Sequence, residues 1–206
     1  EAVYNPLPNY LHVPWSKKSA RAGKHVLCEK PIAMSAGEAR ELVDVRDETN
    51  RHIQEAFMVL HNPQWRKTRE WVREGRIGKL QTMQWSFGYY NVNPNDVRNQ
   101  DDIGGGGVYD IGCYCITTSR YIFEEEPNRV MALIEHDPKF GIDYLTSAIL
   151  DFPSGQASFF VSTQVVDCQR AQIVGTDARL EVEVPCNAPN DRPNRIYVDD
   201  GSGRGR

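Results

Sequence analysis

The chain has 206 residues, of which 40% are hydrophobic and 25% are charged, and its net charge is −4 at pH 7. No basic cluster reaches the size that nucleic acid or an anionic membrane surface requires. No apolar run approaches the roughly 20 residues of a transmembrane helix. The sequence therefore predicts a globular protein with neither a nucleic-acid partner nor a membrane partner.

Five cysteines are scattered along the chain. An odd, scattered set argues against a disulfide framework and favours a reducing compartment, so we predict a cytoplasmic protein. Cys113 and Cys115 could form half of a zinc site, but no second Cys/His pair has the spacing of metal ligands. We therefore predict no metal and interpret both cysteines as small apolar helix residues.

Strands and short helices alternate in the first 58 residues. Ser35 followed by Glu38 has the pattern of a capping box, and Gly23 stands where the end of a helix favours glycine. The alternation indicates a parallel, doubly wound sheet, about half of a nucleotide-binding Rossmann domain, without its G-x-G-x-x-G phosphate loop. In chain order we expect a strand at 2–5, a helix at 10–22, a strand at 25–30, a helix from 36 to about 50 and a strand at 52–58.

Hairpin signals replace this alternation further along, notably at 151–155 and 175–177. Consecutive hairpins imply a mainly antiparallel sheet, so the expected fold is a partial α/β Rossmann domain at 1–58 followed by an α+β domain at 59–206. We also expect a fragment of a longer protein, because 201–206 has no core-forming pattern. The expected elements here are helices at 62–74 and 108–123, a polar loop at 91–103, and strands at 80–90, 129–136, 144–152, 156–164, 169–175, 178–184 and 194–198.

Lys30 lies just after the apolar run His25-Val26-Leu27-Cys28, and Pro31 follows it. The run predicts a strand whose carboxyl end presents the lysine. Ligands of open α/β sheets bind outside the carboxyl ends of the strands. A lysine at that place is suited to chemistry, because burial beside other groups can shift its pKa. On its own, however, a lysine is more often a surface charge.

Asp110 and Tyr114 are four residues apart at the start of the helix that follows the glycine run 104–107. This spacing places both side chains on one helix face. A lysine cation nearby would lower the pKa of the tyrosine from about 10, and the three groups would form an acid/base unit. Taken singly, Asp110 could be a partner of the helix dipole and Tyr114 a half-buried core aromatic.

Three motifs together resemble the glucose–fructose oxidoreductase/inositol dehydrogenase family (Gfo/Idh/MocA). They are Glu29-Lys30-Pro31, Glu55-Ala56-Phe57-Met58, and a Gly-Gly-Gly-x-x-Asp-x-Gly-x-Tyr run at 105–114. Many members of the family carry histidine where this chain has Tyr114. Tyrosine there resembles the branch with glucose–fructose oxidoreductase, dimeric dihydrodiol dehydrogenase and xylose dehydrogenases. Two positions depart from near relatives, which often have arginine and histidine where this chain has Leu60 and Asn62.

The resemblance implies NAD or NADP as cofactor and assigns a role to several residues. Tyr114 would be the general acid/base, assisted by Lys30 and Asp110, and these three would contact the substrate together with Arg98. His12 has a structural alternative, in which both ring nitrogens are satisfied at the start of a helix. The residues expected beside the cofactor are Asn5, Pro6, Leu7, Asn9, His12, Glu29, Lys30 and Pro31.

The expected function is hydride transfer between a nicotinamide and a hydroxyl or carbonyl carbon of a sugar or sugar-like polyol. Two alternatives stay open: a trans-dihydrodiol dehydrogenase, and a catalytically silent binding or assembly module of the same fold. The family further implies a homo-oligomer that packs through the antiparallel sheet. Trp85, Phe87, Phe159 and Phe160 would supply apolar surface for it, or would be ordinary core residues.

Overall fold

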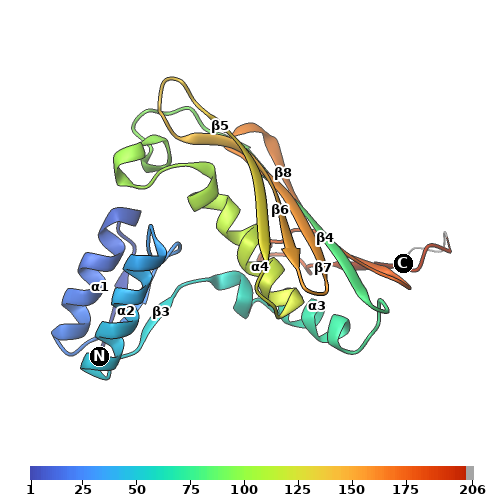
Figure 1. The fold of residues 1–206 in the computed structure, drawn as a ribbon, viewed down its shortest axis with the longest axis horizontal. Coiled ribbons are helices and arrows are strands. Elements are labelled where there is room, and N and C mark those ends of the chain that lie inside the picture. Colours follow the sequence, from blue (N-terminus) through green and yellow to red (C-terminus); the bar gives the residue numbers. More distant parts are fainter. Residues whose placement is uncertain (203–206) are drawn as a thin grey trace.

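The computed structural model describes residues 1–202, which form a three-stranded sheet followed by a seven-stranded one (Figure 1). Residues 203–206, the end of the predicted second domain, lie outside the described part. The partial Rossmann sheet and the mainly antiparallel sheet that the sequence predicts are both present. Within residues 1–202, no helix combines the length and apolar character needed to cross a membrane.

The first sheet is parallel throughout and has the order β1-β2-β3. Its helices α1 and α2 lie side by side over one face, where Ala20, Val26, Cys28 and Val45 form a small core (Figure 1). Ser35 accepts a hydrogen bond from the Glu38 backbone N–H at 3.2 Å and caps α2 as predicted. The elements are β1 (Ala2–Asn5), α1 (His12–Arg21, after a 3₁₀ turn at Asn9–Leu11), β2 (His25–Cys28), α2 (Ala36–Thr49) and β3 (Ile53–Glu55).

The strand predicted at 52–58 is wrong in its second half, because β3 ends at Glu55 and a 3₁₀ turn follows at Met58–His61. The Phe57 ring, 3% exposed, packs into the core beneath the second sheet, with its centroid 5.0 Å from that of Tyr114. Burial of this ring draws the chain away from the parallel sheet. Phe57 therefore ties the first part of the chain to the second.

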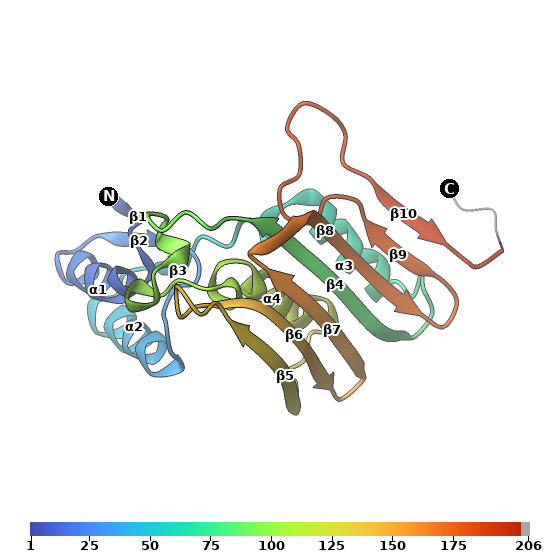
Figure 2. The same cartoon turned by 90° about the horizontal axis from the view of Figure 1, so that it is seen from above.

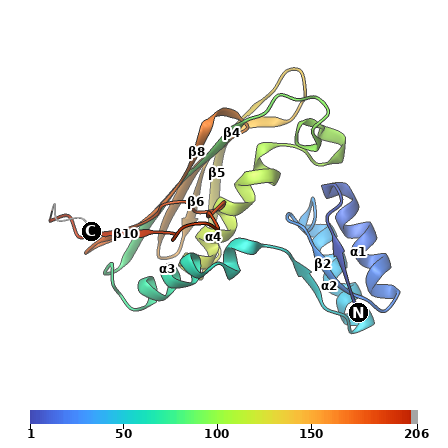
Figure 3. The same cartoon turned by 180° about the vertical axis from the view of Figure 1, so that it is seen from behind.

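The second sheet has the order β10-β9-β8-β4-β7-β6-β5, and all neighbours are antiparallel except β4 and β7 (Figure 2). Helices α3 and α4 cover the face that looks toward the N-terminal part (Figure 3). The elements are α3 (Pro63–Arg73), β4 (Leu80–Tyr90), 3₁₀ turns at Val97–Asn99 and Asp101–Ile103, a π-helical turn (Val108–Gly112), α4 (Cys113–Phe123), β5 (Arg129–His136), β6 (Asp143–Phe152), β7 (Gly155–Ser162), β8 (Gln164–Gly175), β9 (Arg179–Val182) and β10 (Ile196–Asp199).

The side-chain alternation of the strands assigns the aromatic residues to the two faces of this sheet. Trp85, Phe87 and Phe159 are 4%, 5% and 7% exposed and belong to the core beneath the helices, where Trp85 stacks on Trp65. Of the two alternatives that the sequence left open for these three residues, the structure therefore selects the core. Only Phe160, at 38% exposure, lies on the open face. That face gains its apolar surface from strands β5 and β6 instead, through Met131, Leu133 and Ile149.

Candidate active site

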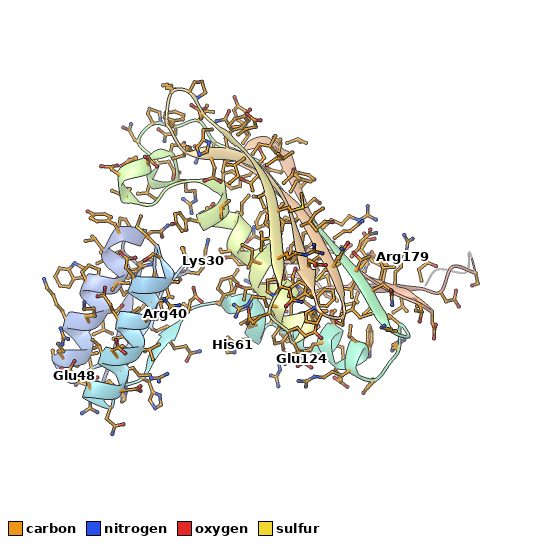
Figure 4. The ribbon with its side chains drawn as sticks, viewed as in Figure 1. Lys30, Arg40, Glu48, His61, Glu124 and Arg179 are labelled. Carbon is orange, nitrogen blue, oxygen red and sulfur yellow. The ribbon has the colours of Figure 1, made fainter. Side chains whose placement is uncertain are left out.

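Lys30 follows β2 and reaches across to the start of the helical segment of the second part (Figure 4). Its Nζ donates a hydrogen bond to the Asp110 backbone carbonyl and lies 3.2 Å from Asp110 Oδ1. Both side chains are largely buried, at 15% and 16% exposure. The lysine also lies over the ring of Tyr114, with Nζ 4.8 Å from the centroid. The structure thus brings the three predicted acid/base residues together.

Asp110 is the centre of this arrangement. Its second oxygen, Oδ2, accepts a hydrogen bond from the Tyr89 hydroxyl at 2.7 Å and another from Arg98 Nε at 3.1 Å. Arg98 in turn pairs with Asp96, with Nη1 3.3 Å from Oδ1. One carboxylate therefore holds a lysine, an arginine and a tyrosine from three separate segments of the chain, which fixes the orientation of Lys30.

The backbone that presents Asp110 is a π-helical turn at Val108–Gly112, where the sequence predicts an ordinary α-helical start. The turn follows Gly106, which has φ +111°, and the Asp110 N–H donates to the Gly106 carbonyl at 3.0 Å. Asp143 accepts a hydrogen bond from the Val108 N–H at 2.7 Å and anchors the turn to β6. Turns of this kind occur frequently at functional sites.

Tyr114 is 9% exposed and packs between the rings of Phe57 and Phe87. Burial raises its pKa well above 10, and the neighbouring Cys113, Cys186 and Asp110 add to the shift. The prediction that a lysine would lower the pKa of this tyrosine is therefore wrong for this structure. Lys30 lies against the face of the ring and directs its hydrogen bonds to Asp110, and the loss of hydration is the largest cause of the raised pKa of Tyr114.

Two cavities meet at these residues. Lys30, Arg98 and Asp110 line both of them and form the wall between them. The larger, of about 660 Å³, is also lined by Tyr114 and Tyr89. The smaller, of about 430 Å³, lies toward the Rossmann sheet. A reacting carbon in the larger cavity would have the Tyr114 hydroxyl and the Lys30 ammonium group beside it, while a second reactant could approach from the smaller cavity.

Most of the residues expected beside the cofactor line the smaller cavity. Asn5 and Pro31 are not among its lining residues: the Asn5 amide is buried and bonds to the His12 carbonyl at 3.1 Å. The ring nitrogens of His12 lie 2.7 Å from the Pro31 carbonyl oxygen and 2.6 Å from that of Leu7, so both face backbone carbonyls, as in its structural alternative. A neutral ring donates to one of these two carbonyls. The expected residues that line this cavity are Pro6, Leu7, Asn9, His12, Glu29 and Lys30.

The smaller cavity fits the ring-and-ribose part of a nicotinamide nucleotide in its chemistry. Pro6 and Leu7 offer apolar surface for a flat ring, and the Glu29 carboxylate can accept hydrogen bonds from ribose hydroxyls. Asn9 joins this loop to the glycine run, because its Nδ2 donates to the Gly104 carbonyl at 2.7 Å. The loop and the glycine run therefore enclose the cavity from two sides.

Tyr89 and Asp143 are site residues that sequence reasoning missed. Tyr89 belongs to the alternating pattern of a long strand and to no motif, so nothing in the sequence separates it from its neighbours. Asn62, one of the two departures from near relatives, caps α3 by accepting a hydrogen bond from the Gln64 N–H at 3.0 Å. Leu60 packs against the core. Both residues therefore have structural roles here.

Comparison with known proteins agrees with this geometry. A family described as "Oxidoreductase family, NAD-binding Rossmann fold" matches residues 1–57, and "GFO/IDH/MocA C-terminal domain" matches residues 65–181. An uncharacterized oxidoreductase, ORF334 of Rhizobium meliloti, is 47% identical over 98% of this chain and 61% of its own length. D-xylose 1-dehydrogenase (NADP(+)) 2 of Haloferax volcanii is 32% identical over 98% of this chain and 62% of its own length.

Among solved structures, the 3-ketoreductase KijD10 of Actinomadura kijaniata, in complex with NADP and TDP-benzene, superposes with a TM-score of 0.93 at 28% identity. The match covers 100% of this chain and 63% of that protein. The chain thus spans slightly less than two thirds of the length of these relatives. With both of its parts matched to the family and the motif residues gathered at one site, the chain belongs to the Gfo/Idh/MocA oxidoreductase family.

Proposed function

We propose that this chain forms the proton-transfer and substrate site of an NAD(P)-dependent oxidoreductase that acts on a sugar or sugar-like polyol. The observation that supports this most is that Lys30 and Asp110 lie on the wall between two cavities, with Tyr114 beside them in the lining of the larger one. The family match and the relatives named above support the same reaction class. NAD or NADP would supply or accept the hydride.

The protein's own contribution is the proton. The Tyr114 hydroxyl is protonated at neutral pH, since burial raises a pKa that is ordinarily about 10. It can therefore donate to the oxygen of a carbonyl as that carbon is reduced, and the product is an alcohol. In the oxidising direction the same oxygen takes the proton back. The Lys30 ammonium group stabilises negative charge on the reacting oxygen. Asp110 orients Lys30, and Tyr89 and Arg98 hold Asp110 in turn.

We further propose that the protein is a homo-oligomer that packs through the open face of the second sheet. Met131, Leu133, Ile149 and Phe160 are 73%, 79%, 45% and 38% exposed on this face. A contiguous apolar surface of this kind is typical of a protein interface. The five cysteines are free in the structure, which supports our placing of the protein in the reducing cytoplasm.

The test of the catalytic proposal is a pair of substitutions in the protein that contains this chain. Tyr114→Phe and Lys30→Ala should each lower turnover with NADH or NADPH across a panel of sugars by about 10²–10⁴-fold. Circular dichroism should show the fold retained. Tyr90→Phe is the matched control, because Tyr90 is the strand neighbour of Tyr89 and 66% exposed. Turnover by the wild type with none of the sugars would instead favour a silent binding or assembly module.

A further inference from the structure

The charges around the larger cavity are unevenly placed. Its lining contains two cationic side chains, Lys30 and Arg98, and three acidic ones, Asp110, Asp167 and Glu183. Both cations are already paired. Lys30 is held by Asp110, and Arg98 bonds to Asp110 and to Asp96 outside the lining. A ligand that enters the cavity therefore meets cations whose charge is balanced by neighbouring carboxylates.

The two remaining acids come from other segments of the lining: Asp167 lies on β8, and Glu183 follows β9. Asp167 is exposed. Glu183 accepts a hydrogen bond from the Tyr197 hydroxyl at 3.1 Å and lies 3.8 Å from the Arg195 guanidinium group, which is 64% exposed. An exposed pair at this distance is weak because water screens it. With three carboxylates and two cations, the lining of the cavity therefore carries a net negative charge.

The rest of the polar lining is uncharged. Tyr114 and Tyr89 contribute hydroxyl groups, and Gln169 and Asn187 contribute amides. The side-chain oxygen Oε1 of Gln169 accepts hydrogen bonds from the backbone N–H groups of Cys186 and Asn187, both at 3.3 Å, which directs its side-chain NH₂ away from these bonds. Neutral donors and acceptors of this kind suit the hydroxyl groups of a polyol.

We propose that this cavity selects uncharged sugars and excludes phosphorylated ones, with Asp167 and Glu183 as the excluding groups. The inference rests on the proposed function and names the substrate class for the same site. A phosphate group carries up to two negative charges. Placed here, it would face two carboxylates and find no cation free of a carboxylate partner among the lining residues. Specificity then comes from a repulsive element as much as from an attractive one.

The test is ligand binding to the protein, without cofactor, measured by saturation-transfer NMR and calorimetry. D-glucose and D-glucose 6-phosphate are the matched probes, since they differ only in the phosphate, and thymidine 5′-diphosphate represents the anionic part of a nucleotide sugar. We expect the dissociation constant of each anionic probe to exceed that of glucose by about 100-fold, because like charges in contact are costly. Raising the salt concentration should reduce the ratio between the dissociation constants of the anionic probes and that of glucose, because salt screens the repulsion.

The double variant Asp167→Asn/Glu183→Gln should bring glucose and glucose 6-phosphate to within about tenfold of each other, since it removes both charges and keeps the side-chain shapes. The matched control is Asp44→Asn/Glu135→Gln, which removes two exposed carboxylates outside the cavity lining. In this control variant, the dissociation constants of glucose 6-phosphate and glucose should differ by the same factor as in the wild type.

Three results would overturn the proposal: glucose 6-phosphate binding as tightly as glucose or more tightly, a ratio unchanged in the double variant, or no binding of glucose. Failure of the proposed function has a different signature, because it is seen as absent turnover with both nicotinamide cofactors on every sugar tested. Turnover that favours phosphorylated sugars would keep the function and reject this selectivity.

Discussion

Lys30 and Asp110 are 80 residues apart in the chain, yet the lysine Nζ lies 3.2 Å from the aspartate Oδ1. The lysine comes from the end of a parallel strand, and the aspartate from the π-helical turn before α4. This ion pair therefore connects the two parts of the chain at the wall between the two cavities. Because both side chains are largely buried, the pair is less screened than one on the surface.

Asp110→Asn tests whether the Asp110 carboxylate orients Lys30. Asparagine keeps the size of the side chain but removes the charge that holds Lys30, Arg98 and the Tyr89 hydroxyl. We expect turnover to fall by about 100-fold, as misplacement of a catalytic group by about 1 Å does. The free energy of unfolding should fall by about 1.5–3 kcal/mol, because hydrogen bonds to a charged group are lost. Steady-state kinetics and urea titration measure the two effects, and Asp101→Asn, in an exposed turn, should change neither.

The pH dependence of the oxidation reaction follows from the buried tyrosine. Burial raises the pKa of Tyr114 above its ordinary value of about 10, so the proton-accepting form becomes more populated as pH rises. We expect the logarithm of kcat/KM for alcohol oxidation to keep rising up to pH 10, because Tyr114 is not yet fully deprotonated there. A pH profile of kcat/KM that levels off near pH 7, and that loses this feature in Tyr114→Phe, would show instead that the pKa of Tyr114 is low.

Gly106→Ala should destabilise the turn that carries Asp110. Gly106 has φ +111°, and an added Cβ would lie 2.0 Å from Asp143 Oδ1, a carboxylate already fixed by the Val108 N–H. Strain of this kind costs about 1–3 kcal/mol. Gly141→Ala is the control, since Gly141 also has a positive φ, +74°, but its added Cβ would contact nothing within 4 Å. Chemical unfolding should show Gly106→Ala to be the less stable of the two variants. Equal losses of the free energy of unfolding would contradict a role for the close contact with Asp143.

Leu133→Glu tests the proposed oligomer. Leu133 is 79% exposed on the open face of the second sheet, and a charge there would be costly to bury in an interface. We expect sedimentation velocity to show an oligomer for the wild type and a monomer for the variant. Val166→Glu is the control, because Val166 is 83% exposed on β8 but does not line the same surface. A wild type that sediments as a monomer would refute the proposal.

Local signals in the sequence were sufficient for the first part of the fold. The capping box at Ser35 predicts the helix that the structure contains, and the strand predicted at 25–30 is present as β2, which ends two residues earlier at Cys28. These signals depend on residues close together in the chain, so tertiary packing did not alter them. The end of β3 could not be predicted in this way, because Phe57 leaves the sheet for a core that includes residues far along the chain, such as Tyr114 and Phe87.

The second sheet and the site show where sequence reasoning stops. Alternation along β4 and β7 predicts two faces, but it does not say which face the helices cover. Trp85, Phe87 and Phe159 could therefore be placed either at an interface or in the core, and the structure places them in the core. The motifs identified Lys30, Asp110 and Tyr114. Tyr89, which holds Asp110, belongs to no motif, and burial reversed the expected pKa shift of Tyr114. The contact of Tyr89 with Asp110 and the pKa shift of Tyr114 both depend on distances that only the folded chain defines.

The position of β4 at the centre of its sheet has a consequence for how the chain is made. This strand pairs with β7 on one side and with β8 on the other, and the last of these partners ends at Gly175, 85 residues after Tyr90. During synthesis, both edges of β4 therefore stay unpaired until most of the chain has left the ribosome. A long strand waiting for distant partners slows folding and exposes apolar side chains to other chains. The nascent protein is then most vulnerable to aggregation between the completion of β4 and the arrival of β8.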